Sequence, residues 1–114
     1  IVHYDFGDAI RTICNTAAED EVNLDLVEFN VDFYKAYKEG FLKHMQSSMT
    51  AIEKKHLPLG VKTMIFIMSL RFLTDYLNGD VYYKTKYPDH NLDRAKNQLK
   101  LLESFTNQLS KIEA

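Results

Sequence analysis

The stretch from residue 58 to 78, PLGVKTMIFIMSLRFLTDYLN, constrains the fold more than any other part of the chain. Pro58 suits the first turn of a helix, and Gly79 suits the left-handed position that ends one. Between them, apolar residues occupy nearly every side of the predicted helix. A helix of this kind lies in the middle of a bundle. We therefore expect it to be the most buried element, with Phe66 in the core.

A second helix is predicted near the amino terminus. The apolar residues that follow Asp5 have helical spacing: Phe6, Ile10, Ile13 and Ala17. Asp5 is a good helix cap, because its carboxylate can accept a hydrogen bond from the first turn. Cys14 lies beside the apolar stripe, so we expect a small buried core residue there and not a nucleophile.

The remaining segments predict further helices around an acidic surface loop at 18–25. One helix begins after Asn30 and carries an apolar stripe of Phe33, Tyr37 and Phe41. Thr50 and Glu53 have the spacing of a capping box for a short helix that ends before Pro58. A final helix starts near Asn91 and keeps its amphipathic pattern to the chain end. The fold class is therefore all-α, with about five helices in a single domain at 1–114.

The triplet Asp5-Phe6-Gly7 has the letters of a kinase magnesium motif, but its surroundings do not fit one. Such an aspartate works beside an upstream loop that supplies a catalytic Asp and an Asn. The nearest His-x-Asp pattern is His3 to Asp5 itself, and Ile10 occupies the position that would need the Asn. We therefore interpret Asp5 as a cap and predict no catalytic or metal-binding residue in this chain.

Charge and cysteine content restrict the function classes further. The 114 residues carry a net charge of −2, which gives no strong field for nucleic acid or anionic lipid. The single cysteine allows no internal disulfide and no cysteine metal cluster, as in a reducing compartment such as the cytoplasm. The most apolar run, MIFIMSL at 64–70, is shorter than the ~20 residues of a membrane span. We also expect the chain, which starts at Ile1, to be part of a longer protein.

A polar stripe interrupts the apolar helix and is the main candidate for a binding site. Arg71, Asp75 and Asn78 lie on this stripe, and a buried Arg71 would need an acceptor. Arg71 is either half of a structural ion pair or the polar wall of a ligand pocket. Tyr82 and Tyr83 should face opposite ways if that segment is extended, one toward the core and one toward a cleft. A tyrosine in such a connection either packs at the rim or contacts a ligand.

Several of these segments, taken in order, resemble one enzyme family. They are YDFGDAIR, NTAAEDE, LPLG and the long block RFLTDYLNGDVYYKTKYPDHNLDRAKNQLKLLES. Together they are similar to the C-terminal part of phosphotransferases of the N-acetylhexosamine 1-kinase type, in the aminoglycoside phosphotransferase and choline kinase-like superfamily. The resemblance covers most of the chain and is weakest between residues 22 and 54.

The resemblance implies that this chain is the helical C-terminal subdomain of a kinase-like C-lobe. The parent enzyme would transfer the γ-phosphate of ATP, with Mg²⁺, to the anomeric hydroxyl of a hexosamine. Its catalytic and metal-binding residues and its nucleotide lobe would belong to the missing N-terminal portion, so the fragment alone would be inactive. Arg71 and Tyr82 match positions that contact the amino sugar, which makes them the expected substrate-binding residues.

A freestanding helical interaction or regulatory module is the alternative function. Such a module would have its own start signal, polar outer helix surfaces and a groove for a partner. The reading frame upstream of Ile1 distinguishes the two hypotheses. An H-G-D loop and an I-D-x-D-T-like segment there would support the kinase, whereas a nearby start codon would support the module.

Overall fold

The computed structural model describes residues 2–45 and 49–112, without the side chain of Val2. The described chain is all-helical, and its elements are α1 (Val2–Ile13), the 3-10 helix η1 (Leu24–Leu26), α2 (Val31–Met45), α3 (Ala51–Lys55), α4 (Leu57–Leu77), α5 (His90–Asn107) and α6 (Leu109–Ile112). A single isolated antiparallel bridge joins Asn15 to Phe29 in the described part. The predicted all-α class is confirmed, with six α-helices described where about five were expected.

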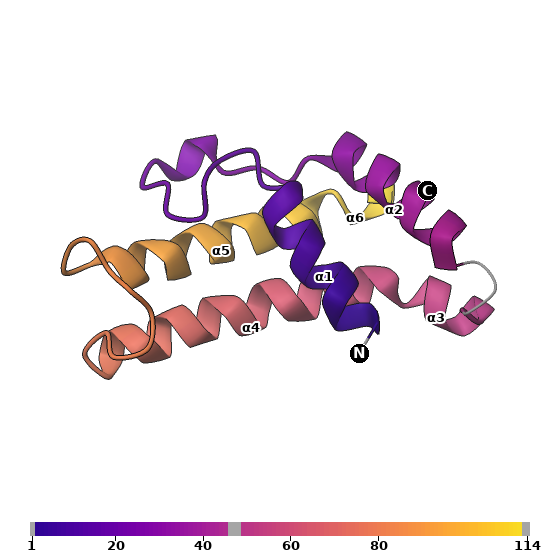
Figure 1. Ribbon diagram of the computed structural model, residues 1–114. Coiled ribbons are helices and arrows are strands. Elements are labelled where there is room, and N and C mark those ends of the chain that lie inside the picture. The colour runs from indigo at the N-terminus through magenta and orange to yellow at the C-terminus, as the bar shows by residue number, and fades with distance from the viewer. Residues whose placement is uncertain (1, 46–48, 113–114) are drawn as a thin grey trace.

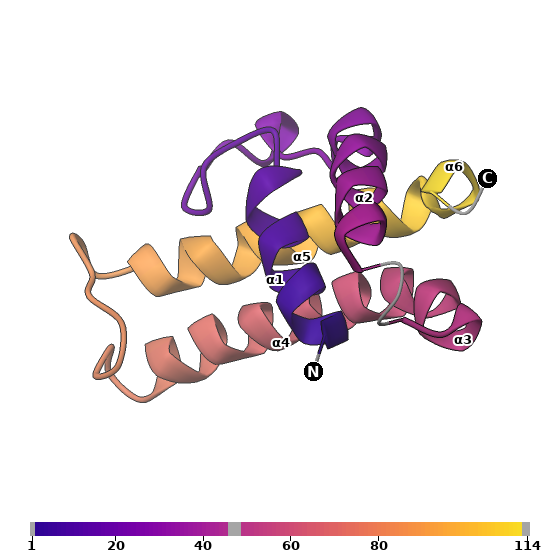
Figure 2. The same cartoon turned by 45° about the vertical axis from the view of Figure 1, so that its right-hand side comes forward.

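Two long antiparallel helices form the base of the molecule. Figure 1 shows α4 and α5 side by side, joined at one end by the connection 78–89, while α1 crosses α4. Turned by 45°, Figure 2 shows α2 standing beside α1, with α3 at the opposite end from the connection. The result is an elongated body of 46 × 27 × 18 Å. The connection therefore lies at a tip, away from α2 and α3.

Two glycines allow α1 and α4 to cross in close contact. A Cβ added to Gly7 would lie 2.5 Å from the carbonyl oxygen of Gly60, and one added to Gly60 would lie 2.6 Å from the carbonyl oxygen of His3. Real Cβ atoms do not approach other atoms that closely. Gly7, the third letter of the Asp-Phe-Gly triplet, thus has a structural explanation in helix packing.

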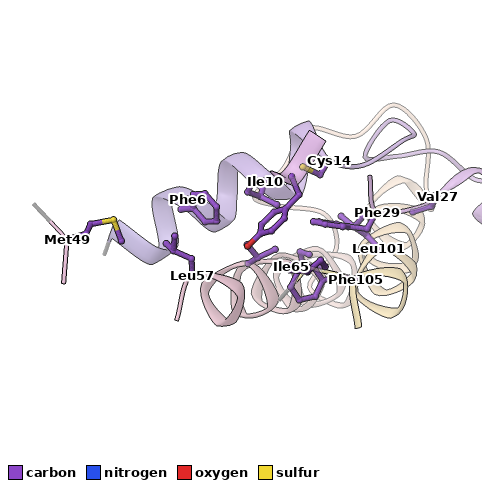
Figure 3. Close-up of a cluster of buried hydrophobic side chains, with 13 residues drawn as sticks. Phe6, Ile10, Cys14, Val27, Phe29, Met49, Leu57, Ile65, Leu101 and Phe105 are labelled. Atoms are coloured by element: carbon purple, nitrogen blue, oxygen red, sulfur yellow. The ribbon is translucent and has the colours of Figure 1, made fainter. Parts of the chain in front are cut away.

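The main core lies where α1, α2, α4 and α5 meet, and aromatic rings fill much of it (Figure 3). The ring centroid of Phe6 lies 4.8 Å from that of Phe41 and 6.0 Å from that of Tyr34. Phe29 and Phe105 pack edge to face at 5.0 Å. Such pairs add to the free energy of burial, which is the dominant stabilising contribution in a small domain.

The structure corrects three details of the predicted amino-terminal half. Helix α1 begins at Val2, so Asp5 lies within its first turn and is not the cap. Ile13 is exposed, and fully buried Cys14 takes the core position, as expected for this cysteine. In α2, Phe33 was expected in the core but is exposed, and the next residue, Tyr34, is buried there. Both shifts have the same cause: neighbouring apolar residues fit the helical period almost equally well.

The predicted helix ends are mostly confirmed. Thr50 and Glu53 form a complete capping box at α3. Gly79 has a φ of +92°, and the amide of Asp80 donates to the Asp75 carbonyl oxygen at 2.8 Å. With the bond from Gly79 N to the Tyr76 carbonyl, this is a Schellman motif that closes α4. The last helix was predicted to run unbroken, but it is interrupted at Gln108 between α5 and α6.

Helix α4 is not surrounded by protein, contrary to the expectation from its composition. One face packs on α1 and α5, but the opposite face exposes large apolar side chains, Leu59, Phe66, Leu70 and Leu77, which we call the α4 stripe. Phe66, expected in the core, is 47% exposed. A helix can thus be apolar all round when only half of its circumference has partners.

Helix α4 is also long and apolar enough to cross a membrane, since its most apolar 18 residues have a mean hydropathy of 1.4. The short run at 64–70 had suggested otherwise, because it is only part of the helix. Core helices of water-soluble proteins meet the same criteria, and α4 packs along α1 and α5 with Ser69 and Asp75 buried. This is therefore weak support for a membrane segment.

Candidate functional site

An open cleft lies beside the carboxyl end of α4, at the tip formed by the connection to α5. Its accessible volume is about 650 Å³, and its lining residues are Ile67, Leu70, Arg71, Thr74, Asp75, Asn78, Val81, Tyr82 and Tyr83. The volume is within the usual range of small-molecule sites. Both residues predicted to bind substrate, Arg71 and Tyr82, line this one cleft. The turn that follows α4 brings them together.

Arg71 is exposed, and the sequence-based expectation of a buried arginine is wrong. Arg71 forms no hydrogen bond or ion pair with any residue that the structure describes. It does not pair with Asp75, one turn away on the same helix. Within the described residues, Arg71 therefore makes no structural ion pair, which was one of its two interpretations. Its guanidinium presents five N–H donors at the cleft.

Tyr82 and Tyr83 take the two different roles that their adjacency suggested. Tyr82 is 80% exposed, whereas Tyr83 packs on buried Phe72 with their ring centroids 4.9 Å apart. The two tyrosine rings meet edge to face at 4.8 Å. The segment 81–83 is an irregular turn and not a strand, and both tyrosines line the cleft, so they differ in burial without facing opposite ways as an extended chain would require.

Asp75 lines the cleft and is only 5% exposed. One carboxylate oxygen accepts from the backbone N–H of Tyr82 at 2.8 Å, and the other accepts from the N–H of Tyr83 at 3.0 Å and from Asn91 Nδ2 at 2.7 Å. Burial by itself raises the pKa of Asp75, but the hydrogen bonds outweigh it and hold the pKa below its ordinary value. The carboxylate therefore remains charged at neutral pH.

Sequence reasoning missed part of the site. Thr74 and the apolar wall of Ile67 and Leu70 line the cleft but gave no polar pattern. Asn91 was interpreted only as part of the turn and cap at the start of the last helix, yet it is fully buried and bound to Asp75. Only the position of Asn91 at a helix start, where asparagine is common, could have drawn attention to it.

A second polar pair, His90 and Asp20, lies in the described chain and links two of its segments. His90 Nδ1 accepts from the Lys86 amide at 3.1 Å, so the proton lies on Nε2, which donates to Asp20 at 2.8 Å. Both ring nitrogens are therefore engaged, and the ring also stacks on Tyr87 at 4.6 Å. This buried histidine ties the loop before η1 to the start of α5.

The described residues offer no set of ligands suited to a bound metal. Across residues 2–45 and 49–112, no group of three or more His, Cys, Asp or Glu side chains is arranged to hold an ion. Burial raises the pKa of the Cys14 thiol to about 12, which makes it a poor nucleophile. The four glycines are isolated from one another in the sequence, so they do not form a glycine-rich phosphate-binding loop. In residues 2–45 and 49–112 there is thus no arrangement of side chains that resembles a magnesium–nucleotide site. A search of known family models finds no match to this chain.

Proposed function

We propose that this chain is the acceptor-binding helical portion of an ATP-dependent phosphotransferase. The enzyme phosphorylates a small molecule, an amino sugar, at its anomeric hydroxyl. The observation that carries the proposal is the cleft at the end of α4. Arg71 and Tyr82 both line it, and their side chains form no hydrogen bond with any described residue. Polar groups that are exposed, unpaired and convergent are suited to a ligand.

The two side chains have complementary chemistry for a sugar. Arg71 keeps its charge at any physiological pH, and its planar fork of donors suits adjacent sugar oxygens. The Tyr82 ring suits the C–H face of a pyranose, and its hydroxyl adds one further polar contact. Thr74 and Asn78 supply smaller polar groups along the same side of α4. In this role the chain orients the acceptor, and a well-oriented acceptor accelerates transfer by lowering the entropic cost of reaction.

ATP and Mg²⁺ would be held by the missing N-terminal portion of the parent protein. When bound, the ion would neutralise charge on the phosphates during transfer. Among the described residues, no group of side chains is arranged to hold the ion. On this proposal the 114-residue chain alone is inactive, and the protein is cytoplasmic, with no nucleic acid or membrane partner.

Titration of the chain with N-acetylglucosamine, followed by NMR chemical shifts, tests the sugar site. Arg71→Ala should weaken binding by about 1.5–3 kcal/mol and Tyr82→Phe by about 0.5–1.5 kcal/mol, as for charged and neutral hydrogen bonds. Two matched controls lie outside the cleft: Lys96→Ala on α5 removes an exposed cation, and Tyr4→Phe on α1 removes an exposed hydroxyl. No response of the wild-type signals at Arg71 and Tyr82 would refute the proposal.

A freestanding helical interaction module is the second candidate, and the α4 stripe favours it. Four large apolar side chains along one exposed helix face are unusual on a monomer and typical of a binding surface. In the kinase proposal this face would instead contact the catalytic portion of the same protein. An upstream reading frame that encodes H-G-D and I-D-x-D-T-like elements would decide for the kinase, and a start codon near Ile1 would decide for the module.

A further inference from the structure

Tyr82 is held at the cleft mainly through its backbone. Its side chain is 80% exposed, and the neighbouring Val81 is 79% exposed, so neither is fixed by burial. Within the described chain, the only ring that packs against Tyr82 is that of Tyr83, at 4.8 Å. By contrast, the backbone amide of Tyr82 donates a 2.8 Å hydrogen bond to Asp75.

The Asp75 carboxylate joins three segments of the chain. It projects from the last turn of α4, accepts the two successive amides of Tyr82 and Tyr83, and accepts Asn91 Nδ2 from α5. Among the described residues it forms no ion pair, so N–H dipoles alone satisfy its charge. Hydrogen bonds to a buried charged acceptor are stronger than neutral ones, and two on adjacent amides fix the direction of the chain.

Helix α5 fixes the orientation of this carboxylate from behind. Asn91 is fully buried and donates to Asp80 as well as to Asp75, at 3.1 and 2.7 Å. Its own carbonyl accepts from Arg94 at 2.9 Å, and the same Arg94 nitrogen donates to the Lys84 carbonyl at 3.1 Å. The connection is therefore attached to α5 on both sides of Tyr82.

From this geometry we propose that Asp75 is the positioning residue of the cleft: it acts through the backbone of Tyr82 to hold the tyrosine ring opposite Arg71. The sugar-binding consequence rests on the proposed function, whereas the positioning itself does not. Asp75 lines the cleft, but both of its carboxylate oxygens already accept hydrogen bonds, so its effect on a ligand is transmitted through Tyr82. An asparagine at this position is nearly the same size but would direct an N–H toward one of the amide donors.

Amide hydrogen exchange tests the positioning directly. In Asp75→Asn the amide that faces the new N–H, that of Tyr82 or that of Tyr83, should exchange about tenfold faster, the factor expected for one lost hydrogen bond. Asp89→Asn is the matched control, because it removes an exposed carboxylate of the same connection that bonds Tyr76 and neither amide. Unchanged exchange at both tyrosines in a folded Asp75→Asn protein overturns the proposal.

A double-mutant cycle with N-acetylglucosamine separates positioning from a general loss of stability. Asp75→Asn should weaken sugar binding about tenfold in the wild type, yet have little further effect once Tyr82→Ala has removed the ring. It should keep its full effect in the Arg71→Ala background. Additive effects of Asp75→Asn and Tyr82→Ala would overturn the positioning role.

Two further results keep these tests independent. If Asp75→Asn does not fold, Asn91→Ala replaces it. This variant removes the side chain that orients the Asp75 carboxylate and keeps both carboxylate oxygens that accept from the amides of Tyr82 and Tyr83. Faster exchange at Tyr82 would support the proposal, and unchanged exchange would overturn it. If the wild type binds no N-acetylglucosamine, the proposed function fails, and the exchange measurement still decides whether Asp75 positions Tyr82.

Discussion

The crossing of α1 and α4 makes a quantitative prediction for Gly7→Ala. An added Cβ would lie 2.5 Å from the Gly60 carbonyl oxygen, whereas ordinary contact begins at 3.4 Å, so the helices must separate by about 0.9 Å (3.4 − 2.5). Overpacking costs about 1–3 kcal/mol, and a backbone obstacle favours the upper end. The better helix propensity of alanine returns about 1 kcal/mol. The free energy of unfolding should therefore fall by about 2 kcal/mol.

Gly40→Ala is the matched control for this prediction. Gly40 lies inside α2, and a Cβ built there has no other atom within 4 Å. The same substitution should raise the free energy of unfolding by about 1 kcal/mol through helix propensity alone. Thermal melts followed by circular dichroism should place Gly7→Ala about 8 °C below the wild type and Gly40→Ala about 4 °C above it. A Gly7→Ala protein as stable as the wild type would refute the close-crossing argument.

Three further predictions concern stability, pH and reactivity. Phe66→Ala should lower the free energy of unfolding by less than about 1 kcal/mol, while Phe105→Ala, fully buried, should lower it by about 3–5 kcal/mol; equal losses in denaturant titrations would contradict the exposed α4 stripe. The hydrogen bond from His90 lowers the pKa of Asp20 below 3.8, so its stabilising contribution is present above pH 3.8 and lost as the pH falls below it. Asp20→Asn should flatten the acid limb of the stability curve, and an unchanged limb would argue against the pair. Cys14, with its pKa raised to about 12, should resist Ellman's reagent at pH 8 until urea unfolds the chain; rapid labelling of the native protein would show that the thiol is accessible.

Local signals in the sequence predicted the features that depend on a few adjacent residues. The capping box of Thr50 and Glu53 depends only on its own four residues. The end of α4 was predictable because Gly79 is the residue type that most easily adopts the positive φ of a helix end. Asp5 was misplaced because the cap and the first turn both favour negative charge, so the residue type alone does not separate the two positions.

Features that depend on distant partners were not predictable. Apolar composition cannot say how many neighbours α4 has, so Phe66 was expected to be buried and is half-exposed. Arg71, on the same helix, is exposed for the same reason. The bond from Asn91 to Asp75 joins two helices and required the tertiary structure. The cleft itself was expected only through Arg71 and Tyr82, without its further lining residues.

The hydrophobic interior is divided unequally along the molecule. The large cluster lies under α1 and α2, whereas the tip that carries the cleft has a smaller cluster. In the described part of the chain this cluster consists of three buried apolar residues, Met68, Phe72 and Ala95, with Leu73 and Tyr83 packed against them. Regions with few buried contacts open at a lower free energy than the whole chain unfolds. The tip should therefore behave as a separate unit of local unfolding. A molecule that binds in the cleft would then suppress this opening, and its binding would appear as slower exchange at the tip while the larger cluster stays unaltered.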